Sequence, residues 1–277
     1  MPTYHVSRLA RRHVTVALSG DGGDEAFGGY RRYKFDRIEN RVRGLLPRAL
    51  WQALGIAYPK LDWLPRFLRF KRTFQNLARD PAEAYARSVS GVLPEEIRPL
   101  LRPEWRDAGL DPLGAVRDAY RSSDGDDALA RAAAADYATW LPGDILVKVD
   151  RASMAVSLEV RAPFLDHELV ELAARMPGAL KLAGGATKGF LRETLRARLG
   201  SENLDRPKQG FSIPLRRWMA GACGDQLEEI RNDPRLDAVL DSSLVADRLG
   251  EHRSGRRNHA DLLWAVMCLA RFLRRWT

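Results

Sequence analysis

Apolar and polar positions alternate along the chain in a way that predicts one short strand followed by many helices. Residues 14–18 form an apolar run rich in β-branched side chains, which predicts a strand, and residues 19–29 form a glycine-rich acidic loop directly after it. Over residues 30–46 the apolar positions recur near the 3.6-residue period of a helix, and Pro47 closes that segment. The chain therefore begins with a predicted strand, loop and helix.

The remaining pattern is helical, with breaks marked by proline, glycine and acidic residues. Residues 47–112 are rich in proline and arginine, and their aromatic side chains are the expected packing anchors between short helices. These anchors are Trp51, Tyr58, Trp63, Phe67, Phe70 and Phe74. The acidic stretch 124–127 is predicted to be a flexible linker. Further helices are predicted at 128–141, at 188–199 with Gly200 as the stop, at 225–249 and at 261–276.

Residues 141–166, LPGDILVKVDRASMAVSLEVRAPFLD, form an amphipathic segment whose charges recur at helical spacing. Asp144, Lys148 and Arg151 share one face by spacings of three and four. Such charges form either a salt-bridged surface or the lining of a site. Residues 161–166 are expected at a helix end, where side chains can turn toward a cleft. The apolar residues Val147, Met154 and Leu158 fall near one stripe.

The composition fits a globular protein of one large or two modest domains, with 277 residues of which 45% are hydrophobic. The formal net charge is +9, and the 45 basic residues comprise 7 lysines and 38 arginines. Because these residues are spread along the whole chain and are not gathered into one cluster with interleaved aromatics, they predict a solvated surface and not a nucleic-acid groove. The basic balance still favours polyanionic ligands such as ATP.

Two cysteines, Cys223 and Cys268, lack metal-ligand spacing, and nothing at the start of the chain resembles a signal peptide. Both features predict free thiols in a reducing cytoplasm. The longest apolar stretch, residues 262–270, is about half the length of the roughly 20 residues that a membrane-spanning helix needs. It predicts a buried helix, and no membrane partner is expected.

The loop SGDGGDEAFGG after the predicted strand has three chemical interpretations. Its glycines and aspartates are an ordinary turn composition. They are equally suited to present backbone amides and carboxylates to a phosphorylated ligand and its metal. A calcium loop of the EF-hand type requires glycine at position six and glutamate at position twelve. Counted from Asp21 these positions hold Ala26 and Arg32, which excludes that type and leaves the first two interpretations equal.

A lysine in the later block RPKQGF, Lys208, lies in a short loop between Pro207 and Gly210. This setting is suited to project one ammonium group into a site, although most lysines are simply exposed. Three blocks then stand in order along the chain: SGDGGDEAFGGY, KVDRASMAVSLEVRAPFLD and RPKQGF. Together they resemble the synthetase domain of the glutamine-hydrolysing asparagine synthetases, and the resemblance covers essentially the whole chain.

That resemblance implies an α/β fold, Rossmann-like and of the adenine-nucleotide α-hydrolase type, of which this chain supplies a predominantly α-helical part with few strands. It implies ATP-dependent conversion of aspartate to asparagine through a β-aspartyl-AMP intermediate, with Mg²⁺ and ammonia. By motif position, the Ser19 and Gly20 backbone contacts the AMP moiety, and Asp24 binds Mg²⁺ on the pyrophosphate. Asp21 takes the acidic position tied to acyl-adenylate formation, where many family members carry the longer glutamate.

The same resemblance assigns charged residues to the walls of the cleft. Lys208 matches the lysine that neutralises charge on the adenylate phosphates. Lys148, Asp150 and Arg151 match a helix that lines the same cleft. Cations are needed there because negative charge develops on the phosphates as the acyl-adenylate forms.

Two features of the family are absent from these 277 residues. The chain begins MPTYHV and so lacks the N-terminal cysteine of a glutaminase domain, and it contains no pyrophosphate loop of the form SGG-x-D-S. We therefore expect residues 1–277 to be the C-terminal part of a synthetase domain, without glutamine hydrolysis of its own, acting with a portion that carries both features. The strand at 14–18 is then expected to be an edge strand that lacks its parallel neighbours.

Two other functions remain open at this point. Residues 58–74 and 77–90 resemble the amidotransferase branch found with exopolysaccharide and exosortase protein-sorting loci. In that case the chemistry is retained and the acceptor is another carboxylate. Alternatively, the chain is an inactive truncated scaffold or binding subunit that keeps the fold without turnover.

Overall fold

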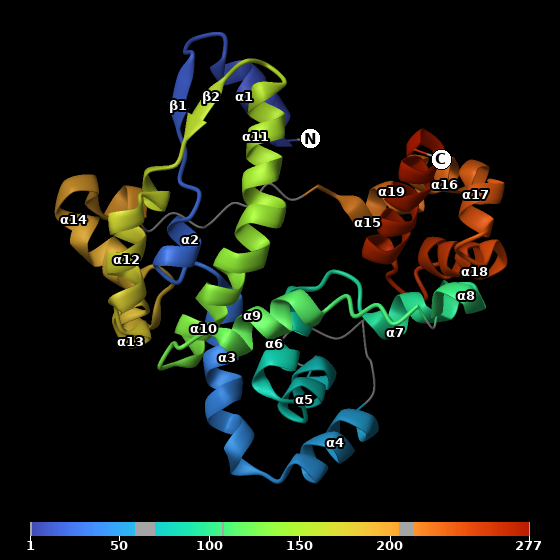
Figure 1. The fold of residues 1–277 in the computed structure, drawn as a ribbon, viewed down its shortest axis with the longest axis horizontal. Helices are drawn as coiled ribbons and strands as arrows, with labels where there is room; N and C mark the ends of the chain where they lie inside the picture. Colours follow the sequence, from blue (N-terminus) through green and yellow to red (C-terminus); the bar gives the residue numbers. More distant parts are fainter. Residues whose placement is uncertain (1, 59–69, 107, 205–212, 277) are drawn as a thin grey trace. The chain divides into compact units, whose positions relative to one another are not determined.

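Strands β1 (Val16–Leu18) and β2 (Glu159–Arg161) lie side by side as a two-stranded parallel sheet (Figure 1). The structure is a computed structural model that describes residues 2–58, 70–106, 108–204 and 213–276. Val16 pairs with Glu159 and Leu18 with Arg161, and the Ser19 amide donates to the Arg161 carbonyl at 2.8 Å. The predicted first strand is confirmed. Two expectations were wrong: residues 159–161 form a strand, not the end of a helix, and β1 does have a parallel neighbour.

Contacts divide the chain into two units, and unit 1 comprises Met1–Tyr58, Lys71–Ser88 and Leu113–Phe211. It contains the sheet. Its α-helices are α1 (Pro2–Ala10), α2 (Gly23–Ala26), α3 (Arg31–Val42), α4 (Arg48–Ala57), α5 (Lys71–Leu77), α6 (Pro81–Val89), α9 (Gly114–Ser122), α10 (Ala128–Ala135), α11 (Val147–Met154), α12 (His167–Arg175), α13 (Gly178–Lys181) and α14 (Gly189–Leu204). Its other helical turns are the 3₁₀ segments η1 (Arg43–Leu45), η5 (Pro163–Leu165) and η6 (Ala183–Gly185) and the π-helix η4 (Asp136–Leu146).

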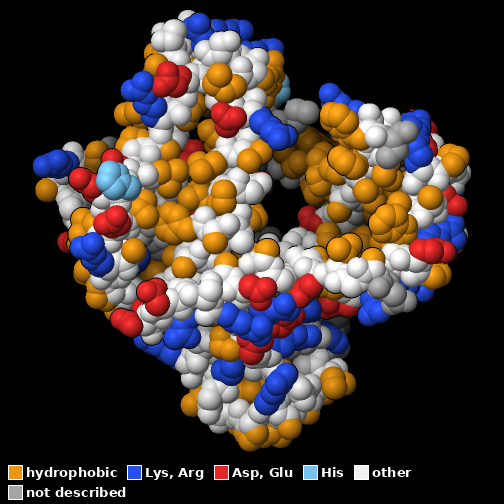
Figure 2. Space-filling model, in the orientation of Figure 1, with side chains coloured by type: hydrophobic (Ala, Val, Ile, Leu, Met, Phe, Trp, Pro, Cys, Tyr) orange, Lys and Arg blue, Asp and Glu red, His pale blue; other side chains and the backbone are white. Residues whose placement is uncertain are grey.

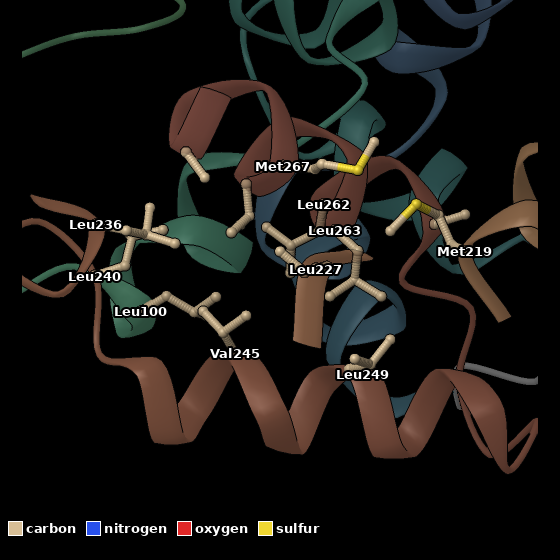
Figure 3. Close-up of a cluster of buried hydrophobic side chains, with 13 residues drawn as sticks. Leu100, Met219, Leu227, Leu236, Leu240, Val245, Leu249, Leu262, Leu263 and Met267 are labelled. Carbon is tan, nitrogen blue, oxygen red and sulfur yellow. The ribbon is translucent and has the colours of Figure 1, made fainter. Parts of the chain in front are cut away.

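Unit 2 comprises Pro59–Phe70, Val89–Pro112 and Ser212–Thr277, and its described part is helical. Its elements are α7 (Pro94–Ile97), η3 (Arg98–Leu100), α8 (Pro103–Arg106), α15 (Leu215–Ala220), α16 (Ala222–Ile230), α17 (Pro234–Asp237), α18 (Ser242–Arg253) and α19 (Ala260–Trp276). A single apolar core that includes Leu100, Met219, Leu227, Leu249 and Leu263 holds them together (Figure 3). The chain is thus predominantly α-helical with few strands, as predicted.

Helix boundaries differ from the predictions where local breaks intervene. The helix predicted at 261–276 is confirmed as α19, but its apolar stretch 262–270 is buried on one face only, since Trp264, Ala265 and Cys268 are exposed. The predicted helix 225–249 is wrong because it is divided into α16, α17 and α18. Helix α10 does not stop at 141 and continues through Pro142 as the π-helix η4. Gly200, with φ of 71°, interrupts α14 as predicted.

Of the other structural predictions, one is wrong and one is confirmed in part. The stretch 124–127 is not a linker between units, because it lies inside unit 1 and Asp127 caps α10 by accepting from the Ala130 amide. Trp51 stacks on Phe74 with ring centroids 6.2 Å apart, which confirms that pair of anchors, whereas Trp63 and Phe67 lie outside the described residues. No helix in the described ranges is long and apolar enough to cross a membrane.

Candidate active site at the carboxyl end of strand β1

A tight glycine loop carries the chain from β1 into the short helix α2. The Gly23 amide donates to the Gly20 carbonyl at 3.2 Å, which closes a turn around Asp21. Gly22 has a φ of 82°, and a Cβ atom there would lie 2.2 Å from Cδ2 of Leu165 in η5. Glycine is therefore required at position 22 both for its left-handed backbone and for its contact with η5. This packing holds the loop at the carboxyl end of β1, where open α/β sheets bind their ligands.

Asp24, which follows the loop in α2, pairs with a lysine from the start of helix α14. The Lys188 Nζ lies 2.9 Å from Asp24 Oδ1, and both side chains are partly exposed. Gly29 makes room for the pair, since a Cβ atom there would lie 1.9 Å from Asp24 Oδ1 and 2.5 Å from Lys188 Cε. The loop thus presents a carboxylate and an ammonium group together, and the sequence analysis did not predict Lys188.

The remaining predicted loop residues surround the same turn. Ser19 continues the backbone pairing of β1, and its buried hydroxyl oxygen has no hydrogen-bond partner within the described residues. Gly20 is exposed, and a Cβ atom on it would meet open space. Asp21, the next residue, is half-buried. An orphaned buried hydroxyl beside an open glycine backbone fits the binding of a polar ligand here.

A buried polar network lies behind the loop. Tyr30 donates from its hydroxyl to Glu25 Oε1 at 2.8 Å, and burial raises the pKa of Glu25 above its ordinary value. The guanidinium of Arg32 lies 3.7 Å from the centroid of the Tyr30 ring and donates to Asp136 Oδ2 at 2.6 Å. Tyr33 donates to the same oxygen at 2.5 Å. The sequence did not predict this network, although most of its side chains come from one short segment, residues 24–33 (DEAFGGYRRY).

The cations predicted from the helical segment 141–166 are not brought into contact with the loop. Lys148 lies on α11, 3.8 Å from Asp144, and Arg151 and Asp150 are exposed. No hydrogen bond or ion pair joins these three α11 residues to the loop in the described part of the chain. The salt-bridged surface is therefore the arrangement observed for Lys148. The predicted site lysine Lys208 lies outside the described residues.

The predicted apolar stripe of that segment is also wrong. Val147 and Met154 are 40% and 58% exposed, whereas Leu158 is buried at 2%. Leu158 lies after the end of α11 at Met154 and directly before β2, so it is not part of the α11 stripe.

The oxygen ligands at the loop fit a magnesium ion carried by a polyphosphate better than one held by protein alone. Among the described residues no three His, Cys, Asp or Glu side chains converge as a metal site. Mg²⁺ is commonly bound through one or two carboxylates together with substrate phosphates. Asp21 and Asp24 supply two carboxylates in this loop, and Asp24 is already in contact with an ammonium group.

Surface charges are mixed in sign over α5, α6 and α9. Figure 2 shows basic and acidic side chains intermingled there, and Arg121 pairs with Asp80 at 3.0 Å while Arg117 pairs with Glu83 at 3.7 Å (Figure 2). Such neutralised pairs agree with a solvated surface at this place and not with a one-signed groove for a nucleic-acid backbone. Cys223 and Cys268 are free thiols, as predicted.

Comparison with known proteins decides which family this loop represents. The asparagine synthase family model matches residues 1–274. The chain belongs to the asparagine synthase family. The resemblance predicted from the three sequence blocks is thereby confirmed, together with the α/β adenine-nucleotide α-hydrolase type of fold.

Related proteins agree with the family assignment. A Mycobacterium tuberculosis protein that carries a provisional asparagine synthetase (glutamine-hydrolysing) name is 36% identical over 272 residues, which are 96% of this chain and 40% of the relative. Asparagine synthetase (glutamine-hydrolysing) 1 of Bacillus subtilis is 28% identical over 274 residues, 96% of this chain and 41% of the relative. The chain therefore spans about two-fifths of the length of these curated relatives.

Proposed function

We propose that this chain contributes the part of the active site that forms the acyl-adenylate in an ATP-dependent amide synthesis, in which aspartate becomes asparagine. The observation that carries the proposal is the glycine loop at the carboxyl end of β1, where Asp21 and Asp24 lie together and Asp24 pairs with Lys188 from the start of α14. Membership of the asparagine synthase family supports it. ATP and Mg²⁺ are the proposed cofactors.

The chemistry explains why such a loop is needed. A carboxylate is a poor electrophile until one of its oxygens becomes part of a leaving group. In the first step an oxygen of the substrate carboxylate attacks the α-phosphorus of ATP, and pyrophosphate leaves. In the second step ammonia attacks the acyl carbon, AMP leaves with the bonding electron pair, and the nitrogen loses a proton. Bound Mg²⁺ would supply positive charge to the pyrophosphate as it departs.

Each predicted site residue has a place in this scheme. We propose that the Ser19 and Gly20 backbone binds AMP, that Asp24 holds the magnesium-bound pyrophosphate, and that Asp21 acts at the acyl-adenylate. We propose that Lys208 neutralises charge on the adenylate phosphates, and that the α11 residues Lys148, Asp150 and Arg151 line the same cleft.

The ammonia donor and the rest of the site belong to the same proposal. The Mycobacterium tuberculosis and Bacillus subtilis relatives have glutamine-hydrolysing in their names and are longer than the matched region. We propose that a glutaminase portion and a pyrophosphate loop act together with these residues. The expected location of the reaction is the cytoplasm.

Aspartate-dependent exchange of labelled pyrophosphate into ATP tests the adenylation step. The assay is run on this chain and on this chain with the glutaminase and pyrophosphate-loop portion of a relative, with Asp21→Asn, Asp24→Asn and the exposed control Asp118→Asn. We expect exchange in the combined system, a loss of at least about a hundredfold in the two loop variants, and no change in the control.

Other outcomes of this assay assign the other functions. Exchange that depends on a different carboxylate, with no labelled asparagine formed from aspartate, identifies the amidotransferase of another acceptor. Absence of exchange with any carboxylate in the combined system contradicts the proposal and identifies a scaffold.

A further inference from the structure

Lys188 combines two unusual features at the site. It is one of two non-glycine residues in the described part of the chain with a positive φ, at 55°. Its Nζ lies 2.9 Å from Asp24 Oδ1, the carboxylate to which the proposed function gives the magnesium-bound pyrophosphate. An unbranched L residue in the left-handed region stores strain, and such strain gathers at ligand sites when the surrounding structure enforces it.

The backbone on both sides of Lys188 is held in place. Its amide approaches the Gly28 carbonyl at 3.4 Å, and its own carbonyl accepts from the Arg192 amide at 2.9 Å in the first turn of α14. The next residue, Gly189, passes so close to the preceding turn that a Cβ atom would lie 2.1 Å from the Ala183 carbonyl oxygen. These contacts direct the Lys188 side chain toward α2.

Stability alone does not account for the strained lysine. The Lys188 and Asp24 side chains are 30% and 24% exposed, so water screens their attraction and an ion pair of this kind contributes little to folding. In addition, a side chain at position 29 would overlap the pair, so glycine occupies that position. The strained backbone at Lys188 and the missing side chain at position 29 both occur where the ligand is proposed to bind.

We propose that Lys188 is a positioning residue that serves as a resident counter-charge for Asp24 and is exchanged for a divalent cation. While no divalent cation is bound, the ammonium neutralises Asp24 through its 2.9 Å contact with Oδ1. When a divalent cation arrives with a polyphosphate, it takes Oδ1, and the displaced ammonium binds a phosphate oxygen. This inference rests on the proposed function. It predicts that removal of the Lys188 charge strengthens the binding of a divalent cation alone and weakens the binding of pyrophosphate.

Binding measurements on the full chain distinguish these two effects. Mn²⁺ alone is titrated by electron paramagnetic resonance, and inorganic pyrophosphate with Mn²⁺ present is titrated by calorimetry, for wild type, Lys188→Met and Lys188→Gln. Lys71→Met in α5 is the matched control, because it removes the same charge from unit 1 without a contact to Asp24. We expect both Lys188 variants to bind Mn²⁺ alone about fivefold more tightly and pyrophosphate about tenfold more weakly than the control. In Asp24→Asn the gain from removing Lys188 should vanish.

A lysine that is merely structural would not raise metal affinity when removed. Mn²⁺ affinity that is unchanged or lower in both Lys188 variants, or undetectable in both, overturns the proposal, as does an equal gain in Lys71→Met. Thermal unfolding shows whether each variant is folded. If only one of the two Lys188 variants folds, its binding data decide the test. No ATP or aspartate is present in these titrations, so failure of amide synthesis and failure of the counter-charge are recorded separately.

Discussion

At the residue scale, the charges around the site depend on partners that neutralise them inside the protein. Asp136 is fully buried, and Arg32 and Tyr33 both donate to its Oδ2. A carboxylate removed from water in this way is stable only while such partners remain, because loss of one partner leaves a buried charge uncompensated. The same Arg32 covers the Tyr30 ring, so one guanidinium connects the residues behind the loop to the π-helix η4.

Two further carboxylates, those of Asp36 and Glu39, predict how stability changes with pH. Burial raises the pKa of Asp36 to about 7, and burial likewise raises that of Glu39 to about 7. Between about pH 4 and pH 7 the folded protein holds protons that the unfolded chain has released, so the free energy of unfolding should fall as pH rises through this window. Urea unfolding at pH 5 and pH 8 measures the change.

Substitution assigns that pH dependence to its source. Asp36→Asn should reduce the difference in unfolding free energy between pH 5 and pH 8, because the amide does not ionise and can still accept from the Tyr120 hydroxyl, which lies 3.1 Å from Asp36 Oδ2. The exposed control Asp118→Asn should leave the difference unchanged. An Asp36→Asn protein with the full wild-type difference would contradict this explanation.

At the scale of elements, caps and breaks decide where the helices begin and end. The predicted helix 225–249 was wrong because apolar periodicity continues across places where the backbone leaves the helix. Asp233 accepts from the Arg235 amide at the start of α17, and Asp241 accepts from the Ser243 and Leu244 amides at the start of α18. Aspartate in these positions satisfies amides that have no partner within the helix.

The cap of α18 gives a direct test. Asp241→Ala should lower the free energy of unfolding and move the urea midpoint to lower concentration, because it removes an oxygen that accepts from two helix amides. Asp247→Ala, an exposed change inside the same helix, should have little effect or stabilise slightly. Urea unfolding measures both. Equal destabilisation by the two variants would show that lost charge, and not capping, is responsible.

Strand pairing belongs to this scale as well. The β-branched run before the glycine loop was sufficient to predict β1. Residues 159–161 carry Glu and Arg at either end and gave no comparable signal, since their strand conformation comes from backbone pairing with Val16 and Leu18. Parallel pairing joins residues far apart in the chain, and local periodicity contains no record of it.

At the scale of the whole molecule, the division into two units predicts that a cavity in the core of one unit destabilises that unit and leaves the other unchanged. Leu263→Ala in α19 should cost about 2–5 kcal/mol, because the fully buried side chain lies in the core of unit 2. Hydrogen exchange followed by mass spectrometry should then show faster exchange in peptides of α15–α19 and unchanged exchange in α3 and α10 of unit 1.

An exposed leucine of the same unit provides the control. Leu110 is 79% exposed, and Leu110→Ala should change neither set of peptides. Equal acceleration in both units after Leu263→Ala would show instead that the chain unfolds as one cooperative body.

The sequence by itself determined the strand and glycine loop at the start of the chain, the carboxylates of that loop and the family to which the chain belongs. Those features are local, because β-branched runs, glycine turns and motif blocks are written in neighbouring residues. It also predicted the helical character of the chain and the position of helix α19.

Only the tertiary structure decided which distant groups meet at that loop. Lys188 reaches Asp24 because Gly29 lacks a side chain and the turn before α14 is packed tightly, and β2 completes the strand pair from another part of the chain. These contacts depend on packing between segments far apart in sequence. No periodicity or spacing within one segment can record them, so the partners of the loop had to be found in space.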